Sequence, residues 1–205
     1  MARLTLTTFL TLDGVMQAPG GPQEDPADDF PYGGWLAPFA EDDMGGHMAE
    51  VLGRARAFLL GRRTYDIFAS YWPNVTDPAD PIATALNDKP KYVASRTLTD
   101  PAWAHSTVLG GDVPAEVARL REDLDGEVQI HGSGALARTL MAHDLIDEYH
   151  LLVFPVVLGR GARLFPDGGL PTSFALTESR TTGAGVVIGT YRPTGRATFG
   201  DLSAR

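Results

Sequence analysis

The 205-residue chain contains no cysteine, which excludes disulfides, thiolate metal sites and cysteine nucleophiles. It also lacks any apolar run close to the roughly 18 residues that a membrane span needs. The first residues, Met1-Ala2-Arg3-Leu4, alternate like a β-strand and lack the apolar stretch of a signal peptide. The sequence therefore predicts a cytoplasmic protein with no membrane partner.

Basic residues are scarce as well. The chain has 17 Lys and Arg against 26 Asp and Glu, a formal net charge of −9. Such a surface repels a phosphate backbone, so we expect no nucleic-acid partner. The charge still permits a small anionic ligand held by a few local arginines.

Several catalytic and metal-binding patterns are also absent. The sequence has no Gly-x-x-x-x-Gly-Lys phosphate loop and no Gly-x-Ser-x-Gly nucleophile elbow. The histidines show no ligand spacing, so we predict no metal site and interpret all of them as structural or surface residues: His47, His105, His131, His143 and His150.

The order of the predicted elements indicates the fold. Strands alternate with helices from about residue 40 to 145, and strands alone follow. We expect strands at 3–12, 57–60, 91–95, 106–109, 128–130, 146–157, 174–182 and 185–192, and helices at about 41–55, from 62, at 112–124 and at 134–142. Loops are expected at 17–38 and 73–81, which are rich in Pro, Gly and Asp.

This order predicts an α/β fold of three layers (α/β/α), with a mostly parallel central sheet and an antiparallel edge hairpin at the C-terminus. Residues 1–192 would form one domain and 193–205 a C-terminal tail.

The stretch 127–136, Glu-Val-Gln-Ile-His-Gly-Ser-Gly-Ala-Leu, is the most informative. A β-favouring run stops at Gly132-Ser133-Gly134, and a helical pattern follows. Glycines at such a junction let backbone N–H groups approach a phosphate, and the helix N-terminus adds partial positive charge. A plain tight turn between strand and helix is the alternative interpretation.

Two more predicted strand ends carry residues that suit an anion: Gly61-Arg62-Arg63-Thr64 and Ser95-Arg96-Thr97. Ligands of open α/β sheets bind outside the carboxyl ends of the strands, so all three ends should face one crevice. An arginine at the ribose position suits a 2′-phosphate, so Ser95-Arg96 indicates NADPH rather than NADH.

These motifs, in this order, resemble the dihydrofolate-reductase-like superfamily. The resemblance is carried by Thr11-Leu12-Asp13-Gly14-Val15, Leu60-Gly61-Arg62-Arg63-Thr64-Tyr65, Ala94-Ser95-Arg96, Ile130-His131-Gly132-Ser133-Gly134 and the run 145–161 with Leu164-Phe165. The sequence is most similar to the RibD C-terminal domain, the reductase half of bifunctional riboflavin-biosynthesis enzymes, and its stand-alone relatives. The resemblance covers roughly residues 3–192.

The resemblance implies an NADPH-dependent oxidoreductase, a homodimer, that transfers a hydride to a small heterocyclic or sugar-linked substrate. That substrate would be pyrimidine- or pteridine-like, as for 5-amino-6-(5-phosphoribosylamino)uracil reductase or dihydrofolate reductase. Gly159 and Gly161 match a family turn near the substrate pocket. The residues implied to bind the cofactor are Gly61, Arg62, Arg63, Thr64, Ser95, Arg96, Gly132, Ser133, Gly134 and Ala135.

Two departures from the riboflavin reductases are visible. Val15 stands where they commonly have Lys after Asp-Gly, and the zinc-binding deaminase half is absent. Both weaken the assignment to riboflavin synthesis itself. A separate alternative function is an NADPH-binding sensor or interaction module of the same fold, without turnover.

The catalytic proton donor is open between three carboxylates. The resemblance implies that Asp13 lies beside the nicotinamide and the substrate, although an Asp before Gly is also a common turn cap. Asp43 and Glu50 fall on the predicted helix before Gly61, near the acid of folate-reducing relatives. For these two, a solvated helix face is the alternative interpretation.

Overall fold

The computed structural model describes residues 1–204 and is built on one eight-stranded sheet with strand order β4-β3-β2-β5-β1-β6-β8-β7. The strands are β1 (Arg3–Thr11), β2 (Ala55–Gly61), β3 (Lys91–Ala94), β4 (Ser106–Leu109), β5 (Glu127–His131), β6 (Glu148–Phe154), β7 (Thr172–Thr181) and β8 (Val187–Arg196). The helices are α1 (Asp42–Arg54), α2 (Arg62–Tyr71), α3 (Pro81–Asp88), α4 (Val113–Asp123) and α5 (Gly134–Ala142).

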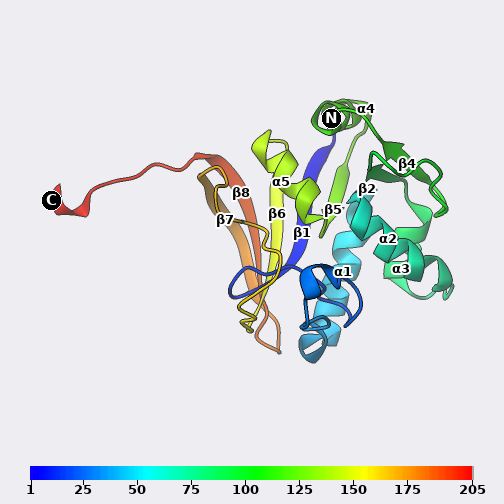
Figure 1. Cartoon of the computed structure of the whole chain (residues 1–205), viewed down its shortest axis with the longest axis horizontal. Coiled ribbons are helices and arrows are strands. Elements are labelled where there is room, and N and C mark those ends of the chain that lie inside the picture. The colour runs from blue at the N-terminus through cyan, green and yellow to red at the C-terminus, as the bar shows by residue number, and fades with distance from the viewer. Residues whose placement is uncertain (205) are drawn as a thin grey trace.

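Six strands are parallel, from β4 to β6, and β8 and β7 add an antiparallel hairpin at one edge. β1 lies in the middle, between β5 and β6, so its residues are paired on both sides. Thr7, for example, is in register with His131 of β5 and His150 of β6. The predicted α/β fold with its C-terminal edge hairpin is confirmed (Figure 1).

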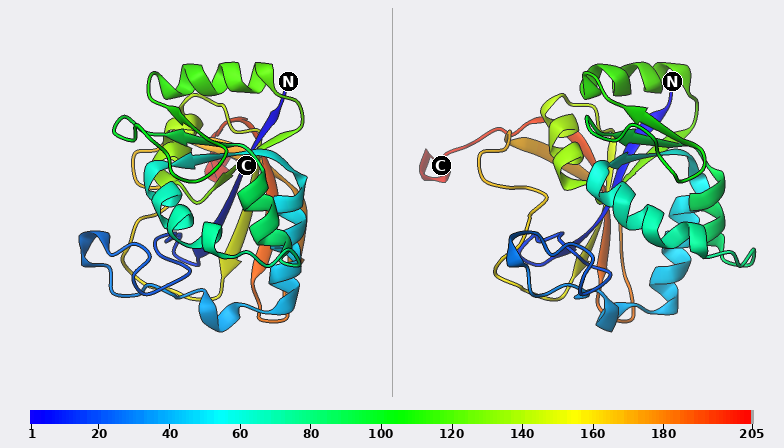
Figure 2. Two further views of the ribbon diagram at one scale, coloured as in Figure 1. Left: turned by 90° about the vertical axis from the view of Figure 1, so that its right-hand side faces the viewer. Right: turned by 45° about the vertical axis from the view of Figure 1, so that its right-hand side comes forward.

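Helices cover both faces of the sheet, as the strand patterns require. β2 alternates, so that Phe58 packs in a cluster with residues of α1, α2 and α3, whereas Leu59 belongs to the cluster that contains residues of α4 and α5. All residues of β2 before Gly61 are buried, with the exception of Arg56. The result is the three-layer arrangement seen in Figure 2.

The predicted surface loop at 17–38 is anchored on the body. Trp35 is buried, and its indole Nε1–H donates to Gln17 O at 2.7 Å. Its ring also meets Phe154 of β6 edge-on at 5.3 Å between centroids. Burying two large aromatic side chains in this way stabilises the loop against the sheet.

One helix was not predicted, and several strand boundaries differ from the predictions; β6, for example, is shorter than the predicted 146–157. α3 had not been expected, although Asp80 and Pro81 form a good helix start: the Asp80 carboxylate accepts from the N–H groups of Ile82 and Ala83. β8 runs to Arg196, into the predicted tail, because its last residues pair with β7. The residues after it extend away from the body (Figure 1).

Within residues 1–204, no helix combines the length and the apolar composition that crossing a membrane requires.

Candidate functional site

A cleft of about 1350 Å³ opens where β2, β3 and β5 end. It is lined by all ten predicted cofactor-binding residues: Gly61, Arg62, Arg63, Thr64, Ser95, Arg96, Gly132, Ser133, Gly134 and Ala135. The three strand ends are far apart in the sequence, and the parallel sheet brings them to one edge. Their convergence, which the sequence predicted, is confirmed; their binding roles stay a prediction.

The ends of β2 and β5 are joined directly. The Gly61 N–H donates to Ser133 Oγ at 2.9 Å, and the Ser133 N–H donates to Thr64 Oγ1 at 3.1 Å. Each strand end thus holds the other through a hydroxyl group. The starts of α2 and α5 are consequently fixed side by side at the cleft.

The turn from β5 into α5 has an uncommon backbone. Gly132 and Ser133 both adopt left-handed conformations, with φ of 53° and 52°. Gly134 follows, and a Cβ there would lie 2.8 Å from Met16 Sδ and 3.1 Å from an Arg138 nitrogen. A side chain there would have to push aside the ends of Met16 and Arg138, and with glycine in place the N-terminal backbone of α5 is bare toward the cleft.

Neither α2 nor α5 has a side-chain cap on its first N–H groups. The first four N–H groups of a helix have no partner within the helix, and an uncapped end offers them to an anion. Two such ends, fixed together, are suited to a diphosphate group.

The end of β3 is shaped by Ser95. Its buried hydroxyl oxygen accepts hydrogen bonds from Thr97 N at 3.2 Å and Leu98 N at 3.0 Å, which turns the chain sharply. The side chain of Arg96 stands exposed at this turn and has no ion-pair partner among residues 1–204. Arg96 is therefore a free guanidinium at the cleft.

Of the other three arginines that line the cleft, two are already in ion pairs, whereas Arg138 donates to the Arg163 carbonyl. Arg62 forms an ion pair with Asp66 one helical turn on, at 2.8 Å. Arg63 pairs at 2.9 Å with Asp25, which comes from the loop at 17–38. Glu24 beside it accepts from the N–H groups of Gly20 and Gly21, and burial raises the pKa of Glu24. The loop thus contributes two carboxylates to the cleft, and both are engaged.

The remainder of the cleft has an apolar wall from α1. Met44, Met48 and Leu52, spaced four residues apart, line it. Beneath them on the sheet lie Thr7 of β1 and His131 of β5, which the sequence reasoning had not assigned to a site. The sequence contains little sign of this contact. His131 directly precedes the glycine turn, but only the pairing of β1 with β5 brings Thr7 beside His131.

The three predicted catalytic carboxylates lie outside the residues that line the cleft. The Asp13 carboxylate accepts from Thr11 Oγ1 at 2.6 Å and from the N–H groups of Leu158 and Gly159. Asp43 is exposed and accepts from Gly183 N, and Glu50 is exposed on α1. Their catalytic roles stay a prediction.

The hydrogen bonds to Asp13 have an electrostatic consequence. Donation from the Thr11 hydroxyl, together with the two backbone N–H groups, lowers the pKa of Asp13 to about 2. Asp13 is therefore a carboxylate at any physiological pH, and it ties the start of the first loop to the turn after β6.

No group of three or more His, Asp or Glu side chains among the described residues could hold a metal ion.

Comparison with known proteins then identifies the family. The model of the RibD C-terminal domain matches residues 2–188. The chain belongs to the RibD C-terminal domain family. That match spans every element from β1 to the start of β8.

Relatives of the family agree in extent. Protein YyaP of Bacillus subtilis (strain 168), named as uncharacterized, is 27% identical over 187 residues, which are 90% of this chain and 92% of the relative. The crystal structure of a Shewanella sp. PV-4 protein named for riboflavin biosynthesis has a TM-score of 0.67 at 24% identity, covering 95% of this chain and 99% of that one.

The fold extends to dihydrofolate reductase. The enzyme from Enterococcus faecalis, solved in complex with NADP(H) and RAB-propyl, has a TM-score of 0.58 at 12% identity, covering 94% of this chain and 96% of that one. At this level of identity the likeness shows the fold alone. The predicted family and the dihydrofolate-reductase-like fold are confirmed.

Proposed function

We propose that this RibD C-terminal domain protein is an NADPH-dependent reductase that transfers a hydride to a small heterocyclic or sugar-linked substrate. One observation carries the proposal: two uncapped helix N-termini, fixed together, share a cleft with the free guanidinium of Arg96. A dinucleotide diphosphate and a 2′-phosphate are the anions that such a pair of sites would suit.

The residues present fit the coenzyme. The backbone from Gly132 to Ala135 and the start of α2 from Gly61 to Thr64 would hold the diphosphate through the N–H groups of the two first helical turns, which no side chain caps. The N–H groups of Gly61, Gly132 and Ser133 are already bonded within the protein and shape the site. Arg96 would take the 2′-phosphate, and Ser95 orients the turn that presents it. Bound there, NADPH would supply a hydride.

The α1 wall would receive the substrate. Met44, Met48 and Leu52 form an apolar surface opposite the strand ends, so a flat ring would be desolvated against it. Excluding water around the reacting atoms is a general requirement of hydride transfer sites. The dihydrofolate reductase neighbour binds NADP(H), which supports the same use of the shared fold.

Protonation of the reduced atom is assigned to no residue by the geometry. Asp13, Asp43 and Glu50 remain the predicted donors, and each would have to act through water because none of them lines the cleft. Replacement of each by its amide, with turnover measured at saturating NADPH, would identify the one that matters. Operation as a homodimer is likewise a proposal that rests on the family resemblance, and the cytoplasmic location stays a prediction from the sequence.

The test is NADPH oxidation with a panel of pteridine, folate and pyrimidine acceptors, followed at the absorbance of the reduced nicotinamide. Binding of NADPH and NADH is measured separately from the fluorescence of the coenzyme. We expect binding that favours NADPH and turnover with at least one acceptor. Tight NADPH binding with an inert panel would favour the sensor alternative, and absence of NADPH binding would contradict both.

A further inference from the structure

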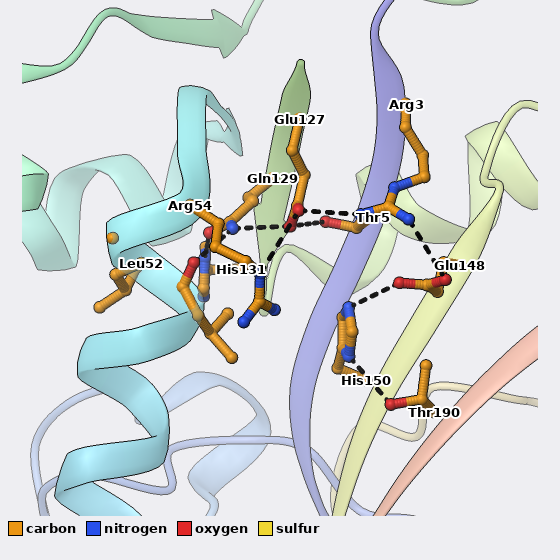
Figure 3. Close-up of polar contacts among 12 residues, drawn as sticks. Arg3, Thr5, Leu52, Arg54, Glu127, Gln129, His131, Glu148, His150 and Thr190 are labelled. Atoms are coloured by element: carbon orange, nitrogen blue, oxygen red, sulfur yellow. Dashed lines mark hydrogen bonds and ion pairs between the residues drawn. The ribbon is translucent and has the colours of Figure 1, made fainter. Parts of the chain in front are cut away.

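A row of polar side chains crosses the sheet beneath α1. His131, Thr7, His150 and Thr190 are cross-strand neighbours on β5, β1, β6 and β8, and they share one face. Figure 3 shows three members of this row, His131, His150 and Thr190, together with Glu127, Gln129 and Glu148 of the same strands. The first two members, Thr7 and His131, also line the cleft.

The orientation of His131 is fixed by the residue two positions earlier. Gln129 donates its amide N–H groups to Val51 O at 2.6 Å and to Glu127 Oε1 at 2.7 Å. The amide oxygen of Gln129 is therefore the atom that faces His131 Nε2, at 3.0 Å, and a carbonyl oxygen can only accept. The imidazole consequently carries its proton on Nε2.

The second ring nitrogen of His131 is then a bare acceptor. Nδ1 forms no hydrogen bond within residues 1–204, and it is not among the fully enclosed polar atoms. Because the ring forms part of the cleft wall, the cleft is where Nδ1 can find a donor. Burial lowers the pKa of His131 to about 4, so the ring is neutral near pH 7.

Thr7 offers the complementary group. Its hydroxyl is enclosed, its side chain is only 2% exposed, and Oγ1 has no hydrogen-bond partner in the protein. A buried hydroxyl without a partner costs free energy, which a ligand that accepts a hydrogen bond would recover. Thr7 and His131 are directly paired across β1 and β5, so a donor and an acceptor stand side by side.

The charges of the cleft lining further limit the kind of ligand that can bind beside Thr7 and His131. The only carboxylates that line the cleft within the described residues are Glu24 and Asp25, and both are already engaged by loop backbone or by Arg63. Glu127 acts on His131 from outside the cleft, and its carboxylate already accepts from Arg3, Thr5 and Gln129. No free carboxylate that lines the cleft is therefore available to stabilise a protonated ligand ring.

We propose that Thr7 and His131 determine substrate specificity by binding the amide edge of a neutral lactam heterocycle, the hydroxyl donating to C=O and Nδ1 accepting from N–H. The inference rests on the proposed function, because it places the ring in the same cleft as the coenzyme. A lactam presents its N–H and C=O side by side, which matches the paired donor and acceptor. A cationic pterin ring would find no counter-charge here.

The experiment uses a matched pair of probes, 5,6-diaminouracil and its 1,3-dimethyl derivative, which lacks both ring N–H groups. Binding of each to the full chain saturated with NADPH is measured by calorimetry. We expect the first probe to bind at least tenfold more tightly than the second. Equal affinity, or no binding of either probe, would overturn the inference.

Three variants locate the effect. Thr7→Val removes the hydroxyl at constant shape, and His131→Gln keeps a polar group near Nε2 while removing Nδ1. Each should weaken diaminouracil about tenfold and leave the dimethyl probe within twofold. Thr190→Val, in the same row but outside the cleft, should change neither. Equal weakening of both probes by either cleft variant would contradict the assignment.

NADPH binding by the wild-type chain separates the two proposals. If NADPH does not bind, the proposed function fails. If NADPH binds with the expected preference and the probes are not distinguished, the specificity assignment alone is wrong.

Discussion

The helices of this protein begin in two different ways. α3 and α4 are capped by their own chain: Asp80 accepts from two backbone N–H groups and Asp112 from one. α2 and α5 begin after Gly61 and Ser133 with no side-chain cap. The difference is not one of length, since α3 is the shortest of the four and is capped twice.

Location explains the difference better. α2 and α5 both begin at the ends of strands that meet in the cleft, whereas α3 follows a loop and its first N–H groups are occupied by Asp80, although Ile82 near its start also lines the cleft. α4 begins at the cleft margin, but the Ala115 N–H in its first turn already donates to the Asp112 carboxylate. α1 also lacks a side-chain cap, but its first turn is exposed and acidic. The paired uncapped ends are thus the ones a ligand would complete.

The largest expected effect comes from supplying the missing cap at α2. Gly61 has an ordinary φ of −72°, and a Cβ there would lie 3.5 Å from the Ser133 Cβ, so a side chain fits. Gly61→Asp would place a carboxylate where the diphosphate is proposed. We expect NADPH affinity to fall about 100-fold, or about 3 kcal/mol, because like charges meet.

Gly61→Ala is the control for Gly61→Asp, since it adds the Cβ without the charge. Thermal unfolding of the Asp variant should occur at the same temperature as wild type or slightly higher, because Asp is a good N-cap. Unchanged coenzyme affinity in a folded Asp variant would show that α2 does not bind the phosphates.

Arg96→Ala tests the free guanidinium. Loss of a charge-assisted hydrogen bond costs about 2 kcal/mol, so NADPH affinity should fall roughly 30-fold. NADH affinity should stay the same, because NADH has no 2′-phosphate. Arg119→Ala on α4, outside the cleft, is the control. A variant that still prefers NADPH to the same degree would refute the role of Ser95-Arg96.

The Asp13 carboxylate lies outside the cleft and accepts hydrogen bonds from backbone N–H groups. Asp13→Asn should lower the free energy of unfolding at pH 7 by about 1.5 kcal/mol, since it weakens charged hydrogen bonds. The pKa of about 2 lies below the ordinary value of 3.8, so this stability is present above pH 3.8 and is lost as the pH falls toward 2.

Urea unfolding at several pH values measures the effect of Asp13→Asn. The difference between wild type and variant should shrink between pH 4 and pH 2. A difference that stays constant over that range would mean that the carboxylate charge contributes nothing to folding.

Removal of a cap should affect folding alone. Asp80→Ala is expected to lower the free energy of unfolding by about 1 kcal/mol. Asp80→Asn keeps an accepting side-chain oxygen and should restore most of that loss. Coenzyme affinity should be the same in both variants, and a parallel loss of affinity would show that the two kinds of helix start are not independent.

The smallest effect is expected at Asp25. Asp25→Asn releases Arg63 from its ion pair, and exposed pairs of this kind are worth about 0–1 kcal/mol. NADPH should therefore bind up to about threefold more tightly. Asp29→Asn, in the same loop and without an ion pair, is the matched control. Weaker NADPH binding by the Asp25 variant would mean that the ion pair prepares Arg63 for the ligand.

Much of the cleft could be predicted from sequence because parallel strands place their carboxyl ends at one edge. Gly61, Ser95 and Gly132 each follow a recognisable strand, so the rule for α/β sheets sufficed to bring them together. The same local reasoning missed α3, although Asp80-Pro81 is a helix start, because the preceding segment is rich in Pro and Asp.

The polar contacts between distant parts of the chain could not be predicted in this way. Thr7 and His131 meet only because β1 inserts between β5 and β6, a pairing that joins residues 124 positions apart. The bonds of Asp13 to Leu158 and Gly159 are equally non-local. A pattern read along the chain gives the ends of strands, whereas the partners of a side chain depend on the order of strands in the sheet.

The ion pair between Asp25 and Arg63 changes what the proposed coenzyme would displace. A phosphate that reaches Arg63 replaces a carboxylate of the same chain, and Arg62 is similarly neutralised by Asp66. Arg96 and Arg138, which both line the cleft and have no ion-pair partner among residues 1–204, would shed mobile counter-ions from solution. Affinity should therefore vary with ionic strength as it does for a site with two bare cations, even though four arginines line the cleft.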